Sequence, residues 1–262
     1  MHDSGLLLPP RAQKPRDVGL TMVLDPGLGT RAFTDLVESH GDLIDVVKFG
    51  WGTSVVTTGL QRKIDAARAN GVDFYFGGTL FERFVLEGAF DAWRSWVDRF
   101  GATTVEVSNG TIELSNSAKA EYIARLAPDY LVYSEVGLKD GELSEQMTTA
   151  DWLDYMREDL AAGSAHVITE ARESGKSGIF TPDGEPKLEL IDAILGSELP
   201  TEKVMFEAPT KEFQTLLITR LGPDVNLGNI ATDDAVALET LRLGLRSDTL
   251  DHFAPHSTAT NH

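Results

Sequence analysis

Cysteine is absent from the 262 residues of this chain. Its absence excludes disulfides, thiolate metal sites and a cysteine nucleophile. No apolar run approaches the roughly 18 residues that a membrane-spanning helix needs. Residues 1–17 also lack the order of charge and hydrophobicity that a secretion signal shows. We therefore expect a soluble, cytoplasmic protein without a membrane partner.

Basic residues are scarce in this sequence. The chain has 23 lysines and arginines against 41 aspartates and glutamates, which gives a formal charge of -18. So acidic a surface favours solubility and repels nucleic acid, and we expect no nucleic-acid partner. In such a chain, a lysine or arginine at the end of a predicted strand stands out as a candidate anion ligand.

The sequence does contain a regular alternation of apolar, β-rich runs and segments of helical period. The predicted strands are 20–25, 44–49, 73–77, 104–108, 130–136, 166–171, 203–207 and 224–229. The predicted helices are 32–40, 54–70, 89–100, 117–126, 149–163, 188–195, 211–221 and 233–245. This order of β-then-α units predicts an α/β fold of the (β/α)8 TIM-barrel type. A doubly wound open sheet is the main alternative.

The same pattern predicts the domain organisation. With 42% hydrophobic residues, the chain can bury a substantial core, and the barrel is predicted to form one catalytic domain over residues 18–250. Residues 1–17, which include Pro9-Pro10, and residues 251–262, which are short and polar, are predicted to be flexible tails.

Charged residues gather at the predicted carboxyl ends of the strands, where barrel enzymes carry their chemistry. They are Asp25, Lys48, Glu106, Glu135, Lys139, Glu170, Arg172 and Glu207. The segment Val47-Lys48-Phe49-Gly50-Trp51-Gly52-Thr53-Ser54 would add free backbone N–H groups to the cation of Lys48. Carboxylates mixed with cations suit a hard divalent cation, most plausibly Mg²⁺, beside an anionic substrate. The alternative is a ring of ion pairs between these acids and the basic side chains.

Two late loops are candidates for a phosphate site. After the sixth predicted strand, the backbone of Ser174 and Gly175 is suited to cradle a phosphate with help from Arg172. Asn226 and Asn229 lie at the end of the eighth predicted strand, and the loops of late barrel strands commonly bind phosphate. The alternative for the first loop is an ordinary glycine-rich turn.

Several sequence blocks together resemble the phosphosulfolactate synthase family, in the family's order and across residues 18–250. The blocks are Leu20-Thr21-Met22-Val23-Leu24-Asp25, Lys48-Phe49-Gly50-Trp51-Gly52-Thr53-Ser54, Gly77-Gly78-Thr79-Leu80-Phe81-Glu82, Glu106-Val107-Ser108-Asn109-Gly110, Glu135-Val136-Gly137, Glu170-Ala171-Arg172-Glu173-Ser174-Gly175, Phe206-Glu207-Ala208-Pro209 and Leu238-Glu239-Thr240-Leu241-Arg242. The resemblance implies a (β/α)8 barrel and a carbon–sulfur lyase that adds sulfite to phosphoenolpyruvate with Mg²⁺. Its product would be phosphosulfolactate, on a route to coenzyme M or sulfolactate.

The resemblance also implies roles for individual residues. Lys139 would be the acid that protonates C2 of the substrate, its pKa lowered by the metal and by neighbouring cations. Lys48 would bind the substrate's carboxylate or phosphate, and Arg172, Ser174 and Gly175 would complete the anion site. The implied metal ligands are Asp25, Glu106 and Glu135.

Three different functions stay open at this point. Pro26 and Asn109 stand where many family members have lysine and aspartate, so a relative that adds a different nucleophile to phosphoenolpyruvate is one of them. A non-catalytic homologue associated with heat stress, as in plants, is the second. The third is a Schiff-base aldolase that uses Lys48 or Lys139. The sequence leaves the oligomeric state open, a homo-oligomer included.

Overall fold

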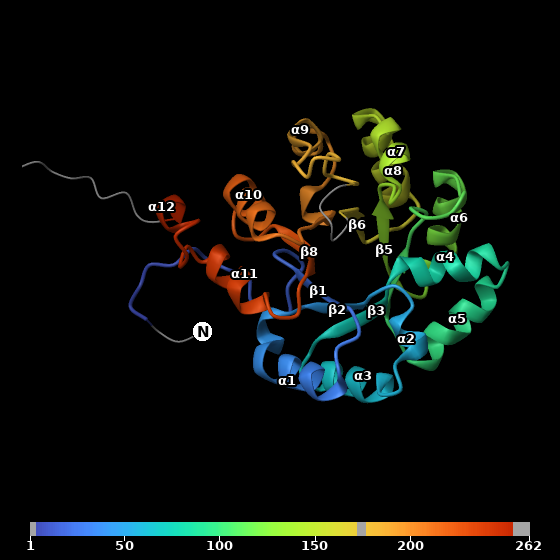
Figure 1. The fold of residues 1–262 in the computed structure, drawn as a ribbon, viewed down its shortest axis with the longest axis horizontal. Coiled ribbons are helices and arrows are strands. Elements are labelled where there is room, and N and C mark those ends of the chain that lie inside the picture. Colours follow the sequence, from blue (N-terminus) through green and yellow to red (C-terminus); the bar gives the residue numbers. More distant parts are fainter. Residues whose placement is uncertain (1–3, 172–176, 254–262) are drawn as a thin grey trace, which may run out of the picture.

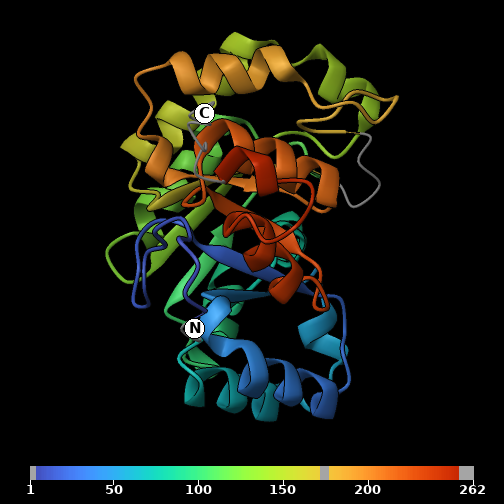
Figure 2. The ribbon, with the colours of Figure 1, turned by 90° about the vertical axis from the view of Figure 1, so that its left-hand side faces the viewer.

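The computed structural model describes residues 4–171 and 177–253 of the chain. Within them, eight parallel strands form one sheet in the order β3-β2-β1-β8-β7-β6-β5-β4. The outermost strands, β3 and β4, lie next to each other. Side-chain hydrogen bonds from Thr103 and Thr104 to Asp73 bridge this seam. The sheet is therefore a nearly closed barrel, and the helices lie outside the strands (Figures 1 and 2). The predicted (β/α)8 TIM barrel is confirmed.

Every predicted strand overlaps an observed one. The strands are β1 Thr21–Asp25, β2 Val46–Phe49, β3 Asp73–Phe76, β4 Thr104–Val107, β5 Leu131–Val136, β6 His166–Thr169, β7 Val204–Glu207 and β8 Asn226–Ile230. The helices are α1 Thr30–His40, α2 Thr53–Val56, α3 Leu60–Ala69, α4 Gly78–Leu86, α5 Phe90–Arg99, α6 Asn116–Leu126, α7 Gly141–Gln146, α8 Thr149–Ala161, α9 Leu188–Gly196, α10 Lys211–Leu221, α11 Ala235–Arg242 and α12 Leu250–Phe253. Short 3-10 turns cover Gly41–Leu43 and Thr201–Lys203.

Some helix predictions were wrong. The predicted helix over 54–70 is two helices, α2 and α3, with a break at residues 57–59. No helix was predicted between residues 70 and 89, but α4 begins at Gly78. Gly78 occupies that position because a Cβ there would lie 2.3 Å from Ser108 Oγ and 2.6 Å from Glu106 Oε1. Close packing, and not a flexible turn, therefore accounts for this glycine.

Side chains of successive strand residues point alternately out of and into the barrel. Outward residues such as Val47, Phe49 and Phe74 belong to the large apolar core between the strands and the helices. Inward residues form a second apolar cluster, made of Leu20, Met22, Val46, Tyr75, Tyr133, Ile168 and Met205. Two residues further along, four of the strands place a charged residue at the inward position, namely Lys48, Glu135, Glu170 and Glu207. The barrel interior is thus apolar at mid-height and charged at the carboxyl ends of its strands.

The amino ends of the strands carry a separate set of ion pairs. Buried Arg11 pairs with Glu239 at 3.0 Å and also with Asp224. Arg242, fully buried on α11, donates to the carbonyl of Val225 at 2.7 Å. Arg16 pairs with Asp45 at 2.8 Å. Residues 11–16 of the predicted tail therefore contact this end of the barrel.

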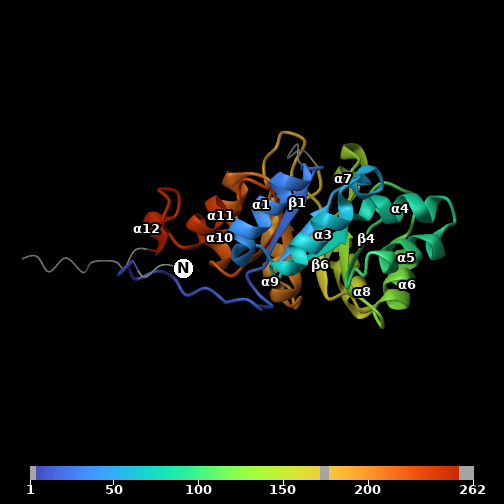
Figure 3. The same cartoon turned by 90° about the horizontal axis from the view of Figure 1, so that it is seen from below.

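Figure 3 shows the two ends of the barrel from the side. The N-terminal segment (blue) runs along the lower edge, and α7 lies near the upper edge, where the strands end. Among the described residues, no helix is both long and apolar enough to cross a membrane.

Candidate active site

A buried lysine at the carboxyl end of β2 holds three glutamates together. Lys48 Nζ lies 3.0 Å from Glu106 Oε2 on β4, 3.3 Å from Glu135 Oε2 on β5 and 3.1 Å from Glu207 Oε1 on β7. All four residues are buried. Burial lowers the pKa of Lys48, but the three carboxylates outweigh this effect and raise it well above its ordinary value. Lys48 therefore carries a fixed positive charge inside the barrel.

A second lysine reaches the same carboxylates from the loop after β5. Lys139 Nζ lies 3.0 Å from Glu135 Oε1 and 3.6 Å from Glu170 Oε2, the glutamate that follows β6. Its side chain is 19% exposed, whereas that of Lys48 is 9% exposed. The structure thus brings Lys48 and Lys139 to one mouth, on opposite oxygens of Glu135. Of the two, Lys139 is the more open to a ligand.

A cavity of about 410 Å³ opens at this mouth. Its lining includes Lys48, Trp51, Thr79, Glu106, Thr111, Glu135, Lys139, Glu170, Glu207 and Asn229. A space of this size is typical of small-molecule sites. Both ammonium groups and four carboxylates therefore line one chamber.

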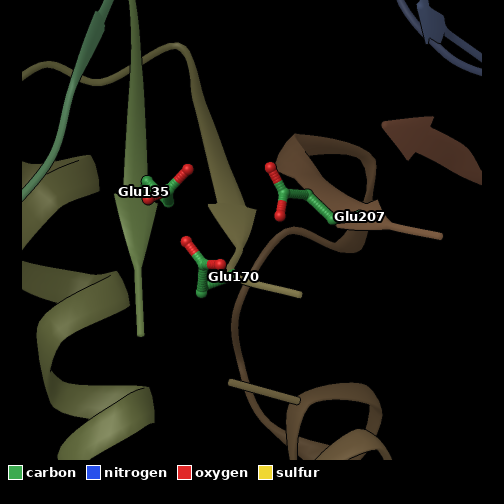
Figure 4. A group of neighbouring side chains, drawn as sticks. All are labelled: Glu135, Glu170 and Glu207. Carbon is green, nitrogen blue, oxygen red and sulfur yellow. The ribbon is translucent and has the colours of Figure 1, made fainter. Parts of the chain in front are cut away.

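Three of the glutamates form a candidate metal site. One oxygen each from Glu135, Glu170 and Glu207 lies within 4.8 Å of the other two, and all three residues are buried. In Figure 4 their carboxylates point toward a common space. Two of the carboxylate oxygens, Glu135 Oε1 and Glu170 Oε2, also face Lys139 Nζ, at 3.0 and 3.6 Å. Oxygen ligands of this kind suit a hard divalent cation such as Mg²⁺.

The charge balance of the chamber points the same way. Four buried carboxylates face the two ammonium groups of Lys48 and Lys139. Burial raises the pKa of Glu170 well above its ordinary value, and the Glu135 carboxylate raises it further. Burial, partly offset by Lys48, raises the pKa of Glu207 to about 7. Two ammonium groups are thus too few for four ionised carboxylates, so Glu170 and Glu207 hold protons more readily than usual, and a divalent cation is suited to take the place of those protons.

The protonation of Lys139 differs from the sequence-based expectation, which was a lowered pKa. Burial does lower the pKa of Lys139, and Lys48 lowers it further, but Glu135 and Glu170 together raise it above its ordinary value. These carboxylates lie closest to the ammonium group, so their attraction dominates. The protein's own groups therefore keep Lys139 charged and able to donate a proton.

Asp25 lies outside this cluster, although it was a predicted metal ligand. Its Oδ2 binds Lys63 Nζ of α3 at 2.6 Å, and its Oδ1 accepts hydrogen bonds from the backbone of Gly27 and Leu28. Because both oxygens are occupied, Asp25 holds the turn after β1 against α3. Glu106, another predicted ligand, lines the cavity but binds Lys48 and the backbone N–H of Gly78.

The predicted substrate-binding residues separate into three groups. Asn229 lines the cavity, and its φ of 52° is unusual for a residue other than glycine. Asn226 lies at the opposite end of the barrel, because β8 begins at this residue; it bonds the backbone of Leu20 and Glu202 there. Arg172, Ser174 and Gly175 lie outside the described residues.

Two members of the glutamate cluster were missing from the predicted ligand set. Glu170 and Glu207 were noticed only as acids at strand ends. A period of two residues identifies them, because each lies two positions after an inward-facing apolar residue, Ile168 or Met205. Glu135 follows Tyr133 in the same way.

Comparisons with known proteins identify the family. The profile of the family described as (2R)-phospho-3-sulfolactate synthase (ComA) matches residues 9–248. The chain is 45% identical to the phosphosulfolactate synthase of Bacillus subtilis, over 95% of this chain and 99% of the relative. It is 40% identical to the phosphosulfolactate synthase of Methanothermobacter thermautotrophicus, over 95% of this chain and 98% of the relative.

Two more distant similarities concern a plant protein and the fold. The chain is 23% identical to the protein HEAT-STRESS-ASSOCIATED 32 of Arabidopsis thaliana, over 83% of both chains. A crystal structure of 3-hexulose-6-phosphate synthase superposes with a TM-score of 0.55 at 16% identity, over 85% of this chain and 97% of that one. This likeness supports the barrel fold alone.

Proposed function

The chain belongs to the phosphosulfolactate synthase family, and on that premise we propose that it adds sulfite to C3 of phosphoenolpyruvate with Mg²⁺, to give phosphosulfolactate. The observation that carries the proposal is the meeting of two lysines and four glutamates around one chamber of about 410 Å³. The reaction forms a bond between sulfur and C3, and C2 then takes up a proton. The site must therefore stabilise negative charge and supply an acid.

Glu135, Glu170 and Glu207 would hold the Mg²⁺. Their clustered oxygens, and the excess of carboxylates over ammonium groups in the chamber, fit such an ion. When bound, Mg²⁺ would stabilise the charge that develops on the carboxylate of phosphoenolpyruvate as sulfur adds. Lys48 fixes two of these glutamates, Glu135 and Glu207, and so keeps their oxygens in place.

Lys139 is the proton donor in this proposal. Its ammonium group is charged, partly exposed and part of the cavity lining, which are the properties required of an acid that acts on C2. The geometry also disfavours an aldolase, because a Schiff base forms from a neutral amine and the pKa values of Lys48 and Lys139 are raised.

A non-catalytic role and a nucleophile other than sulfite find less support in the site. A non-catalytic scaffold gains nothing from four buried carboxylates in one chamber, which cost stability. The substitutions relative to the family pattern, Pro26 and Asn109, do not touch the glutamate cluster. Pro26 is exposed, and Asn109 donates to the carbonyl of Leu114 at 2.8 Å outside the lining of the chamber. Sulfite therefore remains the proposed nucleophile.

Phosphorus NMR of the protein with phosphoenolpyruvate, sulfite and Mg²⁺ tests the proposal. We expect a new phosphate ester signal that a chelator abolishes and excess Mg²⁺ restores. Lys211→Ala, at a surface lysine paired with Asp248, is the control and should react like the wild type. A new ester formed only when sulfite is replaced by another nucleophile would discard sulfite and keep the metal-dependent addition. Unchanged phosphoenolpyruvate throughout would refute both.

A further inference from the structure

We propose that Glu82 on α4 is a positioning residue for Lys139, and that it acts through the loop of residues 108–111 between β4 and α6. Glu82 is 1% exposed and is not part of the glutamate cluster. The kinetic part of this inference rests on the proposed function; the structural part does not.

Both carboxylate oxygens of Glu82 bind this loop. Oε1 accepts a hydrogen bond from Ser108 Oγ at 2.5 Å, and Oε2 accepts one from the backbone N–H of Thr111 at 3.1 Å. Among the described residues, no lysine, arginine or histidine forms an ion pair with Glu82. A buried carboxylate without a partner cation is costly, whereas an apolar side chain would pack against the barrel without that cost. Glu82 attracts the Lys139 ammonium group from a distance, which helps to raise the pKa of that lysine, and its hydrogen bonds fix the loop.

The loop in turn lies directly against Lys139. The carbonyl of Gly110 accepts a hydrogen bond from the backbone N–H of Lys139 at 3.0 Å. A Cβ on Gly110 would come within 3.0 Å of the carbonyl of Gly137 and 3.4 Å of Lys139 Cγ. The loop therefore contacts both the backbone of Lys139 and the stem of its side chain, so a shift of the loop displaces the lysine.

The same helix reaches the other end of the Lys139 side chain. Thr79, on the first turn of α4, has its Oγ1 3.4 Å from Lys139 Nζ. Glu82 follows three residues later, so the two side chains share one face of the helix. Helix α4 thus fixes Lys139 twice, directly at its ammonium group and through the loop at its backbone. The result is the 3.0 Å contact between Lys139 and Glu135.

The test compares three variants. Glu82→Gln keeps the shape of the side chain but presents an NH₂ group to a donor, so it loses one of the two hydrogen bonds. Ser108→Ala removes the hydrogen bond that Ser108 Oγ donates to Glu82 Oε1 and leaves Glu82 itself unchanged. Glu239→Gln is the matched control, a buried carboxylate that binds Arg11 at the amino end of the barrel.

Two measurements are independent of turnover. The first is hydrogen exchange of the Thr111 amide, which we expect to become about tenfold faster in Glu82→Gln and in Ser108→Ala. The second is the rate at which acetic anhydride modifies Lys139, measured by mass spectrometry against Lys211 in the same sample. We expect this ratio to rise several-fold in both variants and to stay unchanged in Glu239→Gln.

The remaining measurements separate positioning from general damage. We expect kcat with phosphoenolpyruvate and sulfite to fall by about 10- to 100-fold in Glu82→Gln, since a displacement of about 1 Å can cost that much. The affinity for Mn²⁺ should stay within about twofold of the wild type, because the glutamate cluster is intact. If wild-type protein shows no turnover, the proposed function fails, and exchange and acetylation still decide the role of Glu82.

Unchanged exchange and unchanged Lys139 acetylation in folded Glu82→Gln would overturn the inference. If Glu82→Gln does not fold, Ser108→Ala decides by the same two measurements. Equal losses of kcat and Mn²⁺ affinity in Glu82→Gln would also overturn it, because they would place the effect in the metal site as a whole.

Discussion

Replacement of Lys119 by methionine should strongly destabilise the protein. Lys119 of α6 pairs with Asp159 of α8 at 2.7 Å, and both side chains are fully buried behind β5. The same ammonium group donates to the backbone carbonyl of Glu135 at 2.9 Å. In Lys119→Met, Asp159 keeps a long contact of 3.4 Å from Asn116 but loses its cation. Removal of one partner of a buried pair costs about 3 to 5 kcal/mol.

Urea unfolding followed by tryptophan fluorescence measures this loss. We expect the free energy of unfolding of Lys119→Met to fall by about 3 to 5 kcal/mol, and that of Asp159→Leu by a similar amount. The double variant should recover most of the loss, because a pair of apolar side chains leaves no unpaired charge. Arg157→Met on α8, the helix of Asp159, is the control. Because the pair of Arg157 with Asp154 is exposed, we expect the free energy of unfolding to change by at most about 0.5 kcal/mol.

Additive losses in the Lys119 and Asp159 variants would refute this reasoning, since independent effects would mean that the pair is not the unit of stabilisation. A loss below about 1 kcal/mol in Lys119→Met would refute it as well, because water would then have to reach Asp159.

Three further predictions concern the mouth and the strands. Lys139→Met should lower turnover by about 100- to 10,000-fold with Mn²⁺ binding retained, and near-normal turnover would remove Lys139 as the acid. Glu170→Gln and Glu207→Gln should each weaken Mn²⁺ binding in titrations followed by electron paramagnetic resonance. Asp25→Asn should lower the melting temperature and leave the Mn²⁺ affinity unchanged. A loss of affinity in Asp25→Asn would show that Asp25 is a ligand. Burial, with help from Lys203, lowers the pKa of His166 to about 4, so the native state binds its proton less readily than the unfolded chain. The contribution of His166 to the free energy of unfolding should be complete above about pH 6.5 and should fall by at most about 3 kcal/mol as the pH falls to about 4. Urea unfolding at several pH values measures this decline, which should be smaller in His166→Gln; an equal decline in both proteins would contradict the prediction.

The strands and the two central lysines were accessible from the sequence for simple reasons. Short apolar runs between polar loops leave few alternatives to buried parallel strands. In so acidic a chain, Lys48 and Lys139 were conspicuous at strand ends. Helix α4 was missed because it begins at Gly78, a residue that weakens the helical signal and whose presence reflects contact with Ser108.

The errors in the site have one physical origin, which is that partners come from distant segments. Nothing in the sequence shows that Lys63 of α3 forms an ion pair with Asp25 and so takes one of its carboxylate oxygens. Asn226 was assigned to the wrong end because a short apolar run does not reveal where its strand begins. The period of two residues marks Glu170 and Glu207 as inward-facing, but only the arrangement of β5, β6 and β7 shows that their oxygens meet that of Glu135 and not that of Glu106.

The apolar layer at mid-height, with Tyr75 and Tyr133 in edge-to-face contact at 5.6 Å, separates two electrostatic systems. Among the residues that the structure describes, Arg11, Glu239 and Arg242 share no side-chain partner with the residues of the chamber. The effects of substitutions at the two ends on the free energy of unfolding should therefore be additive. Substitutions around Arg11 that raise the free energy of unfolding should therefore leave the chamber at the other end unchanged.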